Sequence, residues 1–227
     1  MRISQIIFIL ISVPVMVSCL PDTDHTGISS GRIDYKISYL NEELDKKTLD
    51  ILPRRMKLVF NEKMAINNIE GFMGFYKLEA ITNFHTRKCS TLLKVFEKNY
   101  LFKGKRDEMM CCFDPMDGME ITEIPGTKTI AGFACKKAIV YLPSSHKSFD
   151  IFYTGEIRLK HPNATNPYRE IDGVLMEFEL NLLHLKMRFT AEKFHPMEES
   201  ANKMDFPKNA RFITRDQMTE ILNRLMD

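Results

Sequence analysis

The sequence predicts a mainly β (α+β) protein whose antiparallel sheet is strongly curled. Roughly nine segments alternate apolar and polar side chains with the period of two that is typical of strands, whereas two segments have helical spacing. Such strands give the sheet one apolar face, and that face has to be covered. Two short helices cannot cover so many strands, so the sheet must curl on itself, leave an apolar hollow, or do both.

The composition agrees with one folded domain and argues against nucleic-acid binding. The chain has 227 residues, of which 44% are hydrophobic, so it can form a core. Its 32 Lys and Arg residues against 30 Asp and Glu residues give a net charge of +2. A protein that binds nucleic acid through phosphates needs a larger excess of clustered basic residues.

Residues 1–18 are expected to be an export signal. Arg2 precedes an uncharged stretch whose apolar centre is Ile6–Val17, and this is the charge and length pattern of a signal peptide. A transmembrane anchor is the alternative, but Pro14 and several polar residues interrupt the stretch, and its apolar centre is short for a membrane span.

A cysteine at the end of this segment indicates a lipid anchor. Met16–Cys19 resembles a bacterial lipobox, in which a small residue precedes a cysteine that becomes the lipidated N-terminus. We therefore expect Cys19 to carry lipid and residues 19–30 to form a flexible tether. The expected location is the cell envelope, at the outer membrane, on its periplasmic side or at the surface. Cleavage near Ser18 without lipidation, giving a secreted protein, is the alternative.

Four further cysteines are candidates for disulfide bonds, because exported proteins meet oxidising surroundings. They are Cys89, Cys111, Cys112 and Cys135. Four cysteines allow three pairings, and a bond between the adjacent Cys111 and Cys112 is strained, so the two cross-pairings are favoured. The sequence does not choose between them, and four free buried thiols are the alternative.

The antiparallel β domain is expected to span residues 31–195 and to begin with strand, helix and strand. Residues 32–39 and 56–61 alternate apolar and polar side chains, which predicts two strands. Between them, residues 42–52 have apolar side chains at helical spacing and Pro53 follows, which predicts a short helix.

Further strand-like runs lead to a predicted hairpin. The runs are 72–81, 91–102, 108–113, 119–124, 133–142 and 149–154. Residues 174–180 and 185–191 then alternate on both sides of a tight turn, which predicts a β-hairpin with one buried face. On its outer face, the carboxylates Glu177 and Glu179 are expected to pair with basic residues of the second strand, Lys186 and Arg188.

Residues 196–227 are expected to form a polar connector and a C-terminal helix. Thr214 and Gln217 have the spacing of a capping box, in which each side chain bonds the other residue's backbone. An apolar stripe at helical spacing follows and predicts one buried helix face. It consists of Met218, Ile221, Leu222 and Leu225.

Two stretches resemble the signature of a known family. Residues 129–138 (TIAGFACKKA) resemble the I-x-G-[YF]-x-C-K-K-A pattern of the GLPGLI family of Bacteroidetes envelope proteins. Residues 151–157 (IFYTGEI) resemble its W-Y-T-x-E-I pattern, and residues 168–177 fall where its namesake segment is expected. The resemblance implies a fold similar to the lipoprotein carriers LolA and LolB, a half-barrel with a few short helices on its concave side. It implies a shape and not a reaction.

Two glycines and one cysteine of these stretches are interpreted as structural. Gly132 and Gly173 each precede a predicted strand, where a turn, a bulge or a close approach needs a residue without a side chain. Cys135 shares an apolar alternation with Phe133 and Ile139, so we interpret it as a buried thiol or half-cystine and not as a nucleophile.

No catalytic, cofactor or metal site is expected. Residues 109–119 contain four methionines and two cysteines, soft ligands that suit copper(I), but the spacing of a metal site is absent. We expect Met110 and Cys112 to face the core instead. The six histidines form no ligand or catalytic motif, and no nucleotide-binding motif is present, so the protein is not expected to be an enzyme.

These observations lead to two functional hypotheses. In the first, the apolar concave face accepts a lipid or another apolar ligand. The candidate lining residues are Met56, Leu58, Phe60, Val174, Met176, Phe178, Met187 and Phe189. The alternative for these residues is an ordinary filled core. In the second hypothesis, the protein's own helices fill the hollow, and the protein is a non-enzymatic interaction module whose outer face or terminal helix docks another envelope protein.

Overall fold

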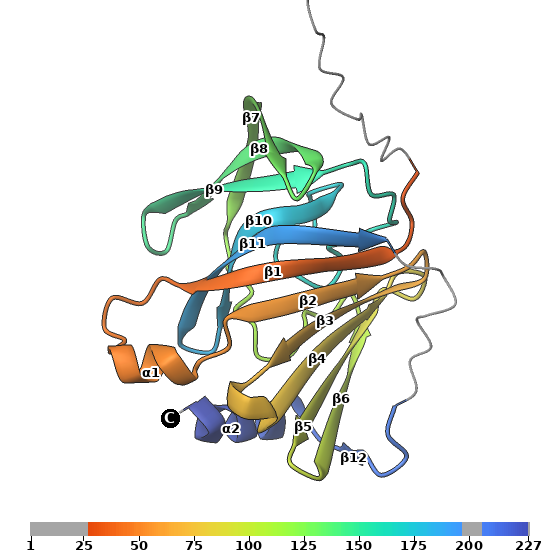
Figure 1. Cartoon of the computed structure of the whole chain (residues 1–227), viewed down its shortest axis with the longest axis vertical. Coiled ribbons are helices and arrows are strands. Elements are labelled where there is room, and N and C mark those ends of the chain that lie inside the picture. Colours follow the sequence, from red (N-terminus) through yellow and green to blue (C-terminus); the bar gives the residue numbers. More distant parts are fainter. Residues whose placement is uncertain (1–26, 197–205, 227) are drawn as a thin grey trace, which may run out of the picture.

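The computed structural model describes residues 27–196 and 206–226. They form one open, curled sheet of twelve strands with two α-helices (Figure 1). The prediction of a mainly β protein with a curled antiparallel sheet is therefore confirmed. The expected export signal, Cys19, most of the expected tether and residues 197–205 of the expected connector lie outside the described residues.

The sheet consists of two antiparallel meanders that meet in its centre. The strands of the first are β1 (Gly31–Tyr39), β2 (Arg55–Phe60), β3 (Met64–Glu70), β4 (Tyr76–Asn83), β5 (Lys88–Val95) and β6 (Lys98–Arg106). Those of the second are β7 (Glu120–Ile130), β8 (Phe133–Leu142), β9 (Lys147–Thr154), β10 (Val174–Leu182) and β11 (Leu185–Pro196). Pairing of β1 with β11 joins the two, and the spatial order is β12-β6-β5-β4-β3-β2-β1-β11-β10-β9-β8-β7.

The central strand β1 shows how alternation assigns the two faces of the sheet. Ile33, Tyr35 and Ile37 are buried on one face, whereas Lys36 of the other face is exposed. A shift of one residue in the pairing would turn all three buried side chains to solvent. The apolar face therefore fixes both the register and the side of the sheet that becomes the concave interior.

The predicted hairpin is formed by β10 and β11, with Leu182 opposite Leu185 at its turn. Its predicted outer-face ion pair is confirmed in part. Glu179 pairs with Arg188 on the neighbouring strand, with 2.5 Å between Oε1 and Nη2. Glu177 instead pairs with Lys128, whose Nζ lies 2.7 Å from its Oε2.

The partner of Glu177 was missed because it comes from β7, which is three strands away in the order of the sheet. The register places the uncharged Thr190 opposite Glu177, so the neighbouring strand offers no cation at that position. The Nζ of Lys128 also lies 4.8 Å from the ring centroid of Phe152. Curvature of the sheet, and not the pattern of the hairpin, brings this lysine to the carboxylate.

Two of the predicted strands differ in the structure. Residues 108–113 form a loop, so the strand predicted there is wrong. Residues 91–102 belong to two strands, β5 and β6, because the chain reverses at Phe96, which has a φ of +50°. Neither glycine nor proline marks that reversal, and the apolar pair at residues 95–96 runs into it, so periodicity alone does not reveal the turn.

The β3–β4 hairpin also differs from the predicted strands. β3 was not predicted, because Asn67 and Asn68 interrupt its apolar alternation. The strand predicted from residue 72 begins only at Tyr76, after a short 3₁₀ turn at Phe72–Gly74. β7 extends beyond its predicted end, past a bulge between Ile124 and Thr127.

The first helix, α1 (Lys46–Ile51), is shorter than the predicted helix over residues 42–52. Its start is set by Asp45, whose carboxylate accepts a 2.7 Å hydrogen bond from the backbone N–H of Thr48. The helix has no buried side chain, so it lies on the surface. It therefore does not cover the concave face of the sheet.

The second helix, α2 (Arg215–Met226), starts at the predicted capping box. The hydroxyl of Thr214 accepts a 3.3 Å bond from the N–H of Gln217, whose side-chain oxygen accepts a 3.0 Å bond from the N–H of Thr214. Met218 and Leu222 of the predicted stripe are fully buried in the main core. The short strand β12 (Arg211–Phe212) precedes α2 and pairs in parallel with β6, so the C-terminal segment folds onto the sheet.

Among the described residues, no helix has the length and hydrophobicity that a membrane span requires.

Candidate functional site

All eight predicted lining residues lie in the filled interior of the curled sheet. Each is at most 9% exposed, and together they belong to one continuous core. Two cavities remain beside them, of about 50 Å³ and about 40 Å³. Met56 and Phe178 line both cavities, whereas Phe60, Met176 and Met187 line neither of them. Sites for lipids and other small molecules usually have volumes of roughly 300–1,000 Å³, so these cavities are much smaller than such a site.

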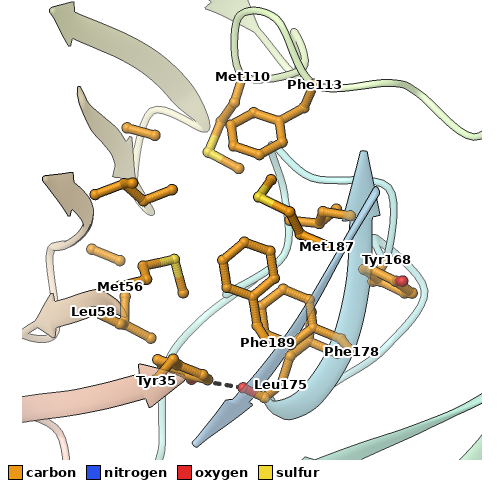
Figure 2. Packing of buried hydrophobic residues seen from close by; sticks show 14 of the residues in the cluster. Tyr35, Met56, Leu58, Met110, Phe113, Tyr168, Leu175, Phe178, Met187 and Phe189 are labelled. Atoms are coloured by element: carbon orange, nitrogen blue, oxygen red, sulfur yellow. Dashed lines mark hydrogen bonds between the residues drawn. The ribbon is translucent and has the colours of Figure 1, made fainter. Parts of the chain in front are cut away.

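Two loops fill much of the interior, and α2 adds the fully buried Met218 and Leu222 to the same core. The first loop, residues 107–119, contributes Met110 and Phe113. Figure 2 shows both side chains pointing from this loop toward Met187 and Phe189 of β11. The N–H of Met110 donates to the carbonyl of Thr165 over 2.9 Å, and Phe113 forms an isolated bridge to β10. The loop therefore connects segments that are far apart in the sequence and closes the concave side.

The second loop, residues 155–173, is held in the interior by buried polar contacts. The amide of Asn163 donates to the carbonyls of Ile171 and Gly173 at 2.9 Å each. The hydroxyl of Thr165 lies 2.6 Å from that of Thr82 on β4. These groups are nearly fully buried, where an unpaired polar atom would cost about 1–3 kcal/mol. These contacts were not predicted, because no local sequence pattern shows that a polar loop enters a core.

The sulfur-rich part of the first loop is mostly packed inside. Met110 and Met116 are buried, in agreement with the prediction that Met110 faces the core. No group of three or more His, Cys, Asp or Glu side chains suited to a metal ion occurs among the residues described. Cys112 also packs against the core, but it is only half-buried, and its Sγ lies 3.4 Å from the hydroxyl of Thr219 on α2.

The four cysteines are free thiols in this structure, so neither favoured cross-pairing is present. Cys89 donates to the carbonyls of Glu108 and Met109, and Cys135 donates to the carbonyl of its own strand neighbour Phe133. Only the adjacent cysteines meet, with 2.8 Å between the two Sγ atoms. Burial raises the pKa of both Cys89 and Cys135 to about 11, which makes these two thiols unreactive at neutral pH.

One end of the sheet carries a patch of exposed apolar side chains that was not predicted from the sequence. Phe72, Met73 and Phe75 lie in the β3–β4 turn and are 47%, 79% and 48% exposed. Phe96 lies in the adjacent β5–β6 turn and is 66% exposed. Its ring centroid is 5.6 Å from that of Phe75, and its N–H donates to the Phe75 carbonyl. These four residues are called the apolar end below.

A groove of about 650 Å³ adjoins the apolar end. It lies between the β5–β6 hairpin and α2, and Phe96 and Ile221 form part of its wall. Glu97 and Lys98 contribute one charge of each sign to its lining. Exposed apolar patches with a polar rim are typical of interaction sites. The β3–β4 turn could have been predicted from the glycines at positions 71 and 74, which flank two of the exposed side chains.

The opposite ends of the strands form a different, basic cleft of about 710 Å³. Lys63, Arg158 and Lys160 line it together with His85, and Glu62 is the acidic residue in the lining. These residues come from the β2–β3 turn, the β4–β5 turn and the loop after β9. Because the three segments are distant in the sequence, no motif indicates the cleft.

Comparison with known proteins assigns no family to the chain. No family model matches it, and no curated protein matches it. Four chains of solved structures match. One of them, described as the structure of PNGF-II in a C2 space group, has a TM-score of 0.49 and is 11% identical. That match covers 85% of this chain and 33% of the other, so this chain spans about a third of the length of PNGF-II.

Proposed function

We propose that this protein is an envelope lipoprotein, anchored through Cys19, that acts as a non-enzymatic interaction module. Its apolar end and the adjoining groove dock another envelope protein. The observation that carries this proposal is the contrast between a filled interior and an exposed cluster of four large apolar side chains. Exposing such a cluster to water is unfavourable, and soluble proteins rarely do so outside interaction sites.

A protein partner fits this surface better than a lipid surface. A groove of about 650 Å³ beside exposed aromatic rings can receive apolar side chains of a partner, and such buried anchors supply most of the energy of protein interfaces. Its lining carries Glu97 as well as Lys98. Surfaces that bind anionic lipids carry an excess of basic residues, which this lining lacks.

The alternative function, binding of a lipid or other apolar ligand in a hollow of the LolA-like sheet, requires the interior to open. The candidate lining residues are present on the concave side, but loops 107–119 and 155–173 would have to leave it. The similarity to the GLPGLI family and to LolA-like half-barrels is proposed on the motifs at residues 129–177 together with the open curled sheet. Native mass spectrometry after gentle extraction separates the two functions: a co-purifying lipid supports the carrier, and its absence supports the module.

The docking proposal is tested by site-specific photo-cross-linking in the envelope of cells that make the full chain. A photoreactive amino acid replaces Met73, the most exposed residue of the apolar end. The control replaces Phe212, an aromatic residue of similar exposure on β12, which lies outside the patch. We expect a cross-link to a different protein from position 73, and Phe75→Ser with Phe96→Ser should reduce it by about tenfold or more.

Three results would contradict the docking proposal. They are equal cross-linking from positions 73 and 212, a product with the mass of two copies of this chain, and transfer of label to lipid only.

The anchor is tested separately by mass spectrometry of the mature N-terminus. We expect an acylated cysteine at position 19 and loss of membrane association in the Cys19→Ala variant.

A further inference from the structure

The two adjacent cysteines at positions 111 and 112 bring their thiols into contact. Their Sγ atoms are 2.8 Å apart. Consecutive side chains of an extended strand point to opposite faces, so this contact requires a different backbone. The backbone of Cys112 is not extended, because its φ of +70° lies in the left-handed region. The chain therefore turns, and both side chains lie on one side. The loop thus presents a preformed dithiol.

The two thiols have different surroundings. Cys111 is fully buried, and its thiol faces the carbonyl of Arg215 at 3.8 Å. Cys112 is half-buried, and its Sγ lies 3.4 Å from the hydroxyl of Thr219. Cys112 is therefore the more exposed residue of the pair, and Cys111 is the fully buried one.

The hydrogen bond between the thiols gives them different pKa values. The pKa of Cys112 is lowered because the Cys111 thiol can donate to a thiolate on Cys112, and the hydroxyl of Thr219 and the charge of Arg215 act in the same direction. The same contact, together with burial, raises the pKa of Cys111. Cys112, the more exposed residue of the pair, is thus the better nucleophile at neutral pH.

Arg215 holds this arrangement in place. Its guanidinium donates to the carbonyls of Met109 and Met110 over 2.6 and 3.3 Å and forms a 2.9 Å ion pair with Glu108. Because these contacts fix the residues just before the dithiol to the first turn of α2, the two sulfurs are kept together by the fold and not by chance proximity of a free loop.

We propose that Cys111 and Cys112 form a thiol–disulfide exchange site for the disulfides of small thiols, with Cys112 as the attacking and Cys111 as the resolving residue. The Cys112 thiolate attacks one sulfur of the small disulfide, the S–S bond breaks, and one thiol leaves with the proton that Cys112 lost. Cys111 then loses its proton and attacks the sulfur of Cys112, which expels the second thiol with that proton. In total, two protein thiols are oxidised to one disulfide, and one small disulfide is reduced to two thiols.

Peptide mapping of the full chain tests this directly. Trypsin cleaves after Arg106 and Lys128, and the peptide between them contains Cys111 and Cys112 but no other cysteine. After incubation with oxidised glutathione, blocking of free thiols and digestion, we expect this peptide to be unblocked and lighter by two hydrogen atoms. Dithiothreitol should reverse the change, and the peptides with Cys89 and Cys135 should remain reduced. A 107–128 peptide that stays fully reduced would overturn the proposal.

Two serine variants test the roles of the two thiols. In Cys111→Ser the resolving thiol is missing but a hydrogen-bond donor remains, so glutathione should be trapped on Cys112. Cys112→Ser should form the adduct at least about tenfold more slowly, because its remaining thiol belongs to the fully buried Cys111, and burial both shields that thiol and raises its pKa. Equal rates of adduct formation, or faster capture by Cys111, would contradict the assignment of roles.

A matched control excludes a general effect of losing a cysteine. Cys135→Ala removes a buried thiol on β8 that takes no part in the pair. This variant should form the Cys111–Cys112 disulfide at the rate of the unmodified protein. Far-UV circular dichroism of each variant shows whether the sheet is intact, and the peptide map of the unmodified protein tests the proposal even where a variant does not fold.

Discussion

Two glycines within residues 129–177 are required for different structural reasons. Gly132 has a φ of +92° and follows Ala131 at +51°, so the two form the tight turn between β7 and β8 that requires left-handed conformations. Gly173 is needed for space, because a Cβ there would lie 2.7 Å from the carbonyl oxygen of Thr154 and from the ring of Tyr153. The interpretation of both glycines as structural positions is confirmed.

The close approach at Gly173 gives a prediction with a matched control. Gly173→Ala should lower the free energy of unfolding by about 1–3 kcal/mol, because the backbone of β9 cannot move away from the added methyl group. Gly155→Ala, where a Cβ meets nothing within 4 Å, should change it by less than about 0.5 kcal/mol. Urea unfolding followed by circular dichroism measures both. Equal effects of the two substitutions would show that steric contact at Gly173 is not the cause.

The contacts between the cysteines could not be predicted from the number and spacing of these residues. Their number and the expected compartment favoured cross-pairings, whereas the structure has free thiols and one close contact, between neighbours in the sequence. Which sulfurs meet depends on the backbone turn at Cys112 and on the path of the 107–119 loop. Neither of these is encoded in cysteine spacing.

At the scale of elements, α2 illustrates a segment that local sequence predicts well. Its start depends on contacts between residues three apart, and its buried stripe depends on the helical period alone. Both conditions are local, and both are met in the structure: the Thr214–Gln217 box is formed and Met218 is fully buried.

Removal of this cap should weaken the C-terminal helix. Thr214→Ala should destabilise the protein by about 1 kcal/mol, because the N–H of Gln217 loses its side-chain acceptor at the helix start. Thr214→Ser keeps the hydroxyl and should restore most of the loss. The measurement is thermal or urea unfolding of the three proteins. An Ala variant as stable as the Ser variant would mean that the hydrogen bond of the cap contributes little.

The segments that were predicted wrongly depend on distant contacts. Residues 108–113 have the apolar content of a strand, but their backbone groups bond to Thr165 and Leu183 and not to one neighbouring strand. β3 has weak alternation, yet it forms a full strand because β2 and β4 pair with it on both sides. In both cases the tertiary partners, and not the local pattern, decide the secondary structure.

At the scale of the whole molecule, stability is expected to be unequal across the sheet. The strands β1 and β11 join the two meanders and have neighbours on both sides, whereas β7 and β12 are the outermost strands. Most residues of β7 are exposed, and so are both residues of β12. Local opening requires little energy where few apolar contacts are lost.

Amide hydrogen exchange measures this difference. We expect the amides of β1 and β11 to exchange most slowly, and those of β12 and of the outer edge of β7 at least about tenfold faster. The amides of Met110 and Asp114 in the 107–119 loop should exchange slowly for a loop, since they bond to the carbonyls of Thr165 and Asn181 in distant segments. Rapid exchange throughout that loop would instead favour an interior that opens, which is what the carrier function needs.

The sequence by itself determined the class of the fold, the positions of most strands, the capped terminal helix and the burial of the eight candidate lining residues. These follow from periodicity and capping, which are properties of neighbouring residues. The tertiary structure decided that loops fill the interior, that four apolar side chains gather at one end of the sheet, and that two adjacent thiols meet. These features depend on contacts between segments far apart in the chain, and such contacts form only when the sheet curls.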